Sequence, residues 1–191
     1  MMNERQGPAR LFAHFLDLKA PRFITGYSAP EADVLNNGEI DSRSNNVTSV
    51  LTRNRDWIDK GIMDFHAILA VPKDDKPSHP RLAQLPEIES FAKTDRERKL
   101  LSMWRSFRTA SMPFVLPPGT PKDRVEILQE GMRKVFKDAE FRGEFKKVIT
   151  DDASPLMPEE LTKIIYEMPR DPEVIDMLKK ISGPEPLPSR Q

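Results

Sequence analysis

The chain has 191 residues and contains no cysteine. Disulfide bonds, thiolate catalysis and cysteine-ligated metal sites are therefore excluded for this sequence. Lysine plus arginine number 30, as do aspartate plus glutamate, so the formal net charge is zero. With no net positive charge, no overall field draws the chain to nucleic acid or to an anionic membrane, and we expect no nucleic-acid partner. The sequence also lacks any apolar run near the roughly 18–20 residues of a membrane-spanning helix.

Sequence motifs of catalysis are missing as well. The patterns GxxxxGK[ST], GxGxxG, GxSxG and HExxH do not occur in the sequence. The three histidines, His14, His66 and His79, lie far apart and show no metal-ligand spacing. His14 falls in a short apolar-periodic segment, which favours a partly exposed helical histidine over a ligand or a base. The sequence therefore predicts a protein that is not an enzyme and needs no cofactor.

Several stretches carry strong helix signals. Thr94 and Glu97 form a capping box ahead of apolar residues at helical spacing. Aspartate followed by proline at 171–172 marks another helix start, and Gly183 marks its end. The expected helices are Arg10–Leu18, Val47–Trp57, Thr94–Thr109, Pro158–Met168 and 171–183.

The stretch Met112–Lys147 reads as a strand, a proline-rich turn and a long helix. Its strand is the apolar run Phe114–Leu116, and the helix is expected to begin with Thr120 as cap and Pro121 at the first position. Apolar residues then recur at helical spacing, so one face of the helix is predicted to be buried. The residues of that face are Val125, Leu128, Met132, Val135 and Phe136, and a second helical segment follows from Asp138.

Two further stretches predict strands. Met63–Val71 is almost continuously apolar, as in a central strand of a parallel sheet, and Pro21–Tyr27 ends at Gly26 before a helix start. A strand that feeds a helix N-terminus exposes backbone N–H groups that can bind an anion. Together with the helices, these runs predict the α/β fold class.

Three motifs, in order, resemble one family of transport receptors. They are ITGYSAPEADVLNNGEID at 24–41, LPEIESFA at 85–92 and FVLPPGTPKDRVEILQEGMRKVF at 114–136. Their order and spacing are similar to those of the TctC or Bug family, the extracytoplasmic solute receptors of tripartite tricarboxylate transporters. The resemblance covers roughly residues 10–180.

The resemblance implies an α/β, type II periplasmic-binding-protein-like fold, in which a ligand lies between two lobes. It also implies capture of a small organic carboxylate and delivery to the membrane permease subunits of the transporter. In that family, backbone amides at turns and helix N-termini hold the carboxylate. The residues that match ligand-facing positions are Tyr27, Ser28, Ala29, Asp41, Asn46 and Thr48.

The chain matches only the rear part of that family. We therefore expect a partial second lobe at 10–62, a partial first lobe with C-terminal helices at 63–191, and incomplete sheets with unpaired edges. The family is periplasmic, but the segment MMNERQGPAR lacks the features of a signal peptide, which predicts a cytoplasmic location for the chain as given.

A second interpretation belongs to a different functional class. The chain could be a receptor-derived fragment that has lost ligand capture and acts as an interaction or structural module. Exposed apolar faces of an incomplete fold would favour self-association or pairing with a missing N-terminal half. A ligand-dependent rise in melting temperature separates the two interpretations, because binding to the native state stabilises it.

Overall fold

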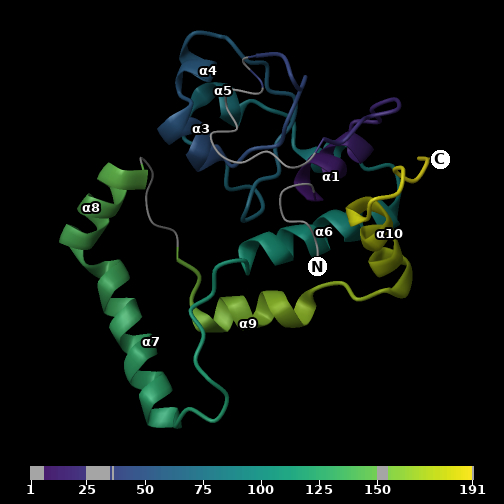
Figure 1. The fold of residues 1–191 in the computed structure, drawn as a ribbon. Coiled ribbons are helices and arrows are strands. Elements are labelled where there is room, and N and C mark those ends of the chain that lie inside the picture. The colour runs from purple at the N-terminus through teal and green to yellow at the C-terminus, as the bar shows by residue number, and fades with distance from the viewer. Residues whose placement is uncertain (1–6, 25–34, 36, 150–154, 191) are drawn as a thin grey trace.

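The computed structural model describes residues 7–24, 35, 37–149 and 155–190. Figure 1 shows the helices of this part of the chain, which account for 55% of the structure. In chain order they are α1 (Gly7–Phe15), α3 (Val47–Arg53), α4 (Asp56–Asp59), α5 (Pro80–Ala83), the 3₁₀ helix η1 (Ile88–Phe91), α6 (Asp95–Thr109), α7 (Lys122–Lys137), α8 (Ala139–Ile149), α9 (Pro158–Glu167) and α10 (Pro172–Ser182).

The main core lies where α10 packs against both α1 and α6. Leu11 and Phe15 of α1 are buried there beside Leu101 of α6 and Ile181 of α10. Each such side chain contributes about 1.5–3 kcal/mol on burial. The start of α1 lies directly on Trp104, so close that a Cβ at Gly7 would be 2.9 Å from the indole ring.

Helix α6 forms because its sequence carries both a start signal and an apolar face. The Thr94 hydroxyl accepts a hydrogen bond from the Glu97 N–H at 3.2 Å, and the Glu97 carboxylate accepts from the Thr94 N–H at 3.3 Å. This reciprocal pair is the capping box that the sequence predicts. Leu100, Leu101 and Trp104 then face the core.

A second, smaller cluster joins α3, α4 and α5. Val50, Leu51, Ile58 and Leu82 are its buried members. The Arg81 guanidinium of α5 donates to the Ile58 carbonyl of α4 and fixes the two short helices to each other. This cluster is separate from the main core, and Figure 1 shows its helices on the far side of α1 from α10.

The predicted α/β fold with periplasmic-binding-protein lobes is wrong. The described residues contain no sheet, only an isolated parallel bridge between Ile68 and Glu87. The Ile68 N–H donates to the Pro86 carbonyl at 3.0 Å, and the Ile88 N–H donates to the Ile68 carbonyl at 2.8 Å. The expected strand at 63–71 is therefore extended for only a short distance beside the segment before η1.

The expected strand Phe114–Leu116 is also wrong. It is an extended connection with Phe114 85% exposed and Val115 78% exposed. A strand is stable only when a neighbouring backbone accepts and donates its hydrogen bonds, and no described segment forms a β-bridge with this one. The predicted strand Pro21–Tyr27 has no regular structure over 21–24, and its remaining residues lie outside the described part of the chain.

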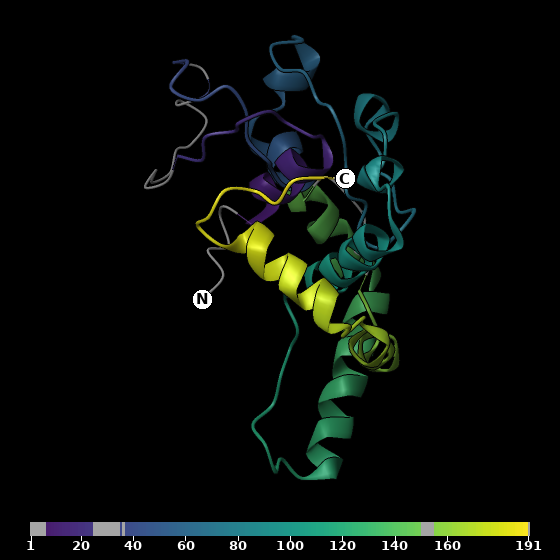
Figure 2. The same ribbon diagram turned by 90° about the vertical axis from the view of Figure 1, so that its right-hand side faces the viewer.

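Helices α7 and α8 form an arm that projects from the body, as Figures 1 and 2 show. Helix α7 forms as predicted. The prediction that its apolar face is buried is wrong, because no described residue of α7 or α8 is fully buried. Arg133 of α7 reaches Glu159 of α9 at 2.8 Å. The predicted Thr120 cap is also wrong, because its hydroxyl donates back to the Pro117 carbonyl and Pro121 is the N-cap.

Candidate functional site

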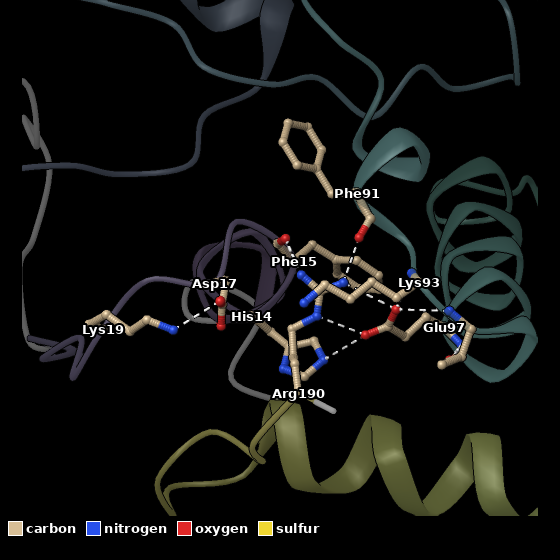
Figure 3. Close-up of polar contacts among 9 residues, drawn as sticks. His14, Phe15, Asp17, Lys19, Phe91, Lys93, Glu97 and Arg190 are labelled. Carbon is tan, nitrogen blue, oxygen red and sulfur yellow. Dashed lines mark hydrogen bonds and ion pairs between the residues drawn. The ribbon is translucent and has the colours of Figure 1, made fainter.

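A buried ion pair joins the C-terminal end of the described chain to the start of α6. Arg190 Nε donates to Glu97 Oε1 at 2.8 Å, and Arg190 Nη2 donates to Glu97 Oε2 at 3.1 Å (Figure 3). The two side chains are only 3% and 6% exposed. Such a two-point contact between guanidinium and carboxylate fixes both groups in direction as well as in distance.

Backbone groups make further hydrogen bonds with both members of this pair. Arg190 donates to the backbone carbonyls of Phe15 in α1 and Phe91 in η1, and Lys93 N–H donates to Glu97. Burial alone would raise the pKa of Glu97, but its hydrogen bonds with Arg190 and with backbone N–H groups lower that pKa below its ordinary value. The contacts of Arg190 hold the residues after α10 against α1 and the start of α6 (Figure 3).

His14 lies beside this pair and is buried, with 3% of its surface exposed. The prediction of a partly exposed histidine is therefore wrong. Its Nε2 is 3.7 Å from Glu97 Oε1, and neither ring nitrogen makes a hydrogen bond of ordinary geometry within the described chain. Burial lowers the pKa of His14, the nearby Arg190 charge lowers it further, and Glu97 offsets part of the effect.

We expect the lowered pKa of His14 to make stability depend on pH. The unfolded chain takes up a proton near the ordinary value of 6.5, whereas the folded protein resists protonation until the pH is lower. The free energy of unfolding should therefore fall as the pH drops below about 6.5. Urea unfolding between pH 7.5 and pH 5.5 measures this, and His14→Leu should flatten the slope. An equal slope in His14→Leu would contradict it; His66→Leu, at an exposed position, is the matched control.

A second buried arginine, Arg10 of α1, has no carboxylate partner within the described residues. Arg10 is 3% exposed, and its Nε donates to the Ile181 carbonyl at 2.6 Å while Nη2 donates to the Glu185 carbonyl. Its guanidinium also lies over the Phe23 ring, 4.6 Å from the ring centre. Among the described residues no aspartate or glutamate side chain pairs with it. Burial lowers the pKa of Arg10, but a guanidinium stays charged at neutral pH.

Arg10 lines a pocket of about 610 Å³ between α1, the segment that follows it and the residues after α10. The described polar lining includes His14, Arg190 and the ion pair of Lys19 with Asp17, whose atoms are 2.9 Å apart. Four prolines, together with Leu18 and Phe23, provide much of the apolar lining. The pocket thus combines a buried positive charge with an apolar wall, which is the usual character of a small-molecule site.

Of the residues proposed from the family resemblance, the described ones, Asp41, Asn46 and Thr48, do not line this pocket. Tyr27, Ser28 and Ala29 lie outside the described residues. Asp41 is exposed in a bend. Asn46 caps α3, where its side-chain oxygen accepts from the Thr48 N–H at 2.8 Å, so these two predicted residues are brought together at a helix start.

No sequence pattern indicates that Arg10, His14 and Arg190 come together. Arg10 and Arg190 are at opposite ends of the chain, and no local pattern predicts that the residues after α10 return to α1. The sequence did predict Glu97, but only as a capping residue. Burial of a charged residue inside an apolar helix face depends on a partner that a single sequence does not identify.

The described part of the chain shows neither a metal site nor a membrane-spanning helix. No group of three or more histidine, aspartate or glutamate side chains there could hold a metal ion. None of the described helices is long and apolar enough to cross a membrane. Comparison of the chain with protein families, curated proteins and solved structures found no match.

Proposed function

We propose that this chain binds a small organic carboxylate as the solute-binding component of a tripartite tricarboxylate-type uptake system. In that role it would present the carboxylate to the membrane permease subunits. The proposal keeps the activity implied by the family resemblance and assigns it to the pocket beside α1. It does not depend on the two-lobe fold, which the described structure lacks.

The observation that carries the proposal is the buried Arg10 guanidinium in the pocket wall. A buried cation is costly unless a negative group compensates it, and no described carboxylate does so. Its Nε and one Nη2 hydrogen are used by carbonyl groups, which are neutral. A carboxylate in the pocket could accept from the remaining hydrogens and supply the missing charge.

The ordered sequence motifs give independent support for the same class of ligand. The stretches at 24–41, 85–92 and 114–136 resemble a family of receptors that capture organic anions. Most of the first stretch lies outside the described residues, so the turn around Tyr27 remains a second candidate for contact with the ligand. Both lines of support converge on a small carboxylate rather than on nucleic acid or a metal ion.

A thermal-shift screen tests the proposal. The purified chain is heated with citrate, succinate, malate, glutamate and a series of aromatic carboxylates. At a free concentration about 100 times its Kd, a ligand that binds only the native state stabilises the protein by about 2.7 kcal/mol. For a chain of this size we expect a rise in melting temperature of about 5–10 °C with at least one acid. A cooperative melt that no carboxylate shifts would contradict carboxylate binding.

A second candidate function rests on the arm formed by α7 and α8. Leu128 is 52% exposed and Val135 is 40% exposed along one stripe of α7, and Phe114 in the preceding connection is 85% exposed. Contiguous apolar surface of this kind often marks a protein interface. The arm therefore favours the alternative of an interaction module. Association through it would make the melting temperature rise with protein concentration, with or without a carboxylate.

A further inference from the structure

The positively charged side chains that line the pocket differ in the partners that they already bind. Arg190 is committed to Glu97 by two hydrogen bonds, and Lys19 is committed to Asp17 at 2.9 Å. Arg10 uses its Nε and Nη2 on carbonyl groups, and no described acceptor receives a hydrogen bond from its Nη1. Among the described lining residues, Arg10 is thus the one cation that has no carboxylate partner.

Negative and apolar groups surround that single cation. Asp17 and Glu185 also line the pocket, so a second carboxylate on a ligand would lie near residues of like charge. The rest of the lining includes Leu18, Phe23 and four prolines, which offer contact area without polar partners. A second charged group on a ligand would meet no described cation there that is not already paired with a carboxylate.

We propose that the pocket selects monocarboxylates with an apolar or aromatic body over dicarboxylates and tricarboxylates. The carboxylate accepts hydrogen bonds from Arg10 Nη1, and the apolar body packs against Phe23 and the prolines. The inference rests on the proposed function and narrows its ligand class.

Isothermal titration calorimetry with defined acids tests the selectivity. The full chain is titrated at pH 7.5 with benzoate, phenylacetate and hexanoate, and with succinate and citrate. We expect phenylacetate or benzoate to bind at least about tenfold more tightly than succinate. Each aromatic acid gains one charge pair with Arg10 and an apolar contact, whereas the second carboxylate of succinate finds no unpaired cation. Glu185→Gln should improve succinate binding and so reduce the difference in affinity between the aromatic acids and succinate.

Two variants locate the binding site. Arg10→Gln should weaken phenylacetate binding by about tenfold or more, whereas Arg81→Gln, which also loses an arginine bonded to a carbonyl, should leave it unchanged. If Arg10→Gln does not fold, Phe23→Ala provides the readout, since Phe23 is partly exposed on the segment after α1. Phe23→Ala should weaken phenylacetate binding more than succinate binding.

The outcomes separate this inference from the proposed function. Tighter binding of citrate or succinate, lost in Arg10→Gln, would overturn the selectivity and leave carboxylate binding intact. Binding that neither Arg10→Gln nor Phe23→Ala affects would overturn the pocket assignment. No heat from any acid, with a cooperatively folded protein, would overturn both.

Discussion

Replacing Arg190 with methionine is expected to lower the free energy of unfolding by about 3–5 kcal/mol. The change leaves the Glu97 carboxylate buried with its guanidinium partner removed, and it takes hydrogen bonds from the carbonyls of Phe15 and Phe91. Breaking a buried pair on one side is costly because the remaining charge is stranded away from water. Urea denaturation monitored by circular dichroism measures the loss.

A surface pair provides the matched control for Arg190. Lys99 lies 2.7 Å from Asp171, but the two side chains are 53% and 36% exposed. Water competes for such a pair, so Lys99→Met should cost less than about 1 kcal/mol. A similarly small loss of stability in Arg190→Met would mean that the residues after α10 do not stay packed against α1 in solution. The pocket beside α1 would then lack one wall.

Leucine-to-alanine substitutions should reduce stability strongly in the body and very little in the arm. Leu101 of α6 is completely buried, so Leu101→Ala should cost about 2–5 kcal/mol through lost apolar contact and a cavity. Leu128 of α7 is 52% exposed, and Leu128→Ala should change stability by no more than about 0.5 kcal/mol. The same denaturation measurement compares the two variants directly, since the chemical change is identical.

The Leu128 result also tests how the arm is used. A loss of 2 kcal/mol or more in Leu128→Ala at high protein concentration that disappears on dilution would show that another copy of the chain covers the arm. The same loss at every concentration would contradict an exposed arm and mean that α7 packs against the body. Leu101→Ala should be destabilising by the same amount at every concentration.

The helices of this protein are largely predictable because their signals are local. The capping box of Thr94 and Glu97 and the proline at position 172 start α6 and α10 where the sequence predicts. Asp138 likewise starts α8, accepting a hydrogen bond from the Phe141 N–H at 2.8 Å. Each of these signals involves residues within four positions of each other, so no information about distant segments is needed.

The strands and the buried face of α7 were not predictable for the same physical reason. A run such as Phe114–Leu116 satisfies its backbone only if another strand lies beside it, and the pattern does not say whether that strand exists. The apolar stripe of α7 indicates what a partner would cover, not that the partner belongs to this chain. Within the described residues Leu128 and Val135 of the stripe are exposed, no residue of α7 is fully buried, and the expected sheet is absent.

The candidate site depends on contacts between residues that are far apart in the sequence. Arg10 reaches the Ile181 carbonyl across 171 positions, and Arg190 reaches the Phe15 carbonyl across 175 positions. The sequence shows these arginines only as ordinary basic residues. Their burial follows from the packing of α1 against α10, and the pocket follows from the return of the chain after Gly183.

The NMR signal of the Arg10 Nε–H group tests most directly the central claim, which is that a carboxylate binds beside Arg10. ¹H–¹⁵N spectra resolve arginine Nε–H groups, and the Arg10 signal is identified by its loss in Arg10→Lys. Titration with phenylacetate should shift this signal in a saturable manner while the Arg81 signal stays fixed, since Arg10 lines the pocket and Arg81 does not. An Arg10 signal that does not move, when the spectrum shows a folded protein, would contradict carboxylate binding at this site.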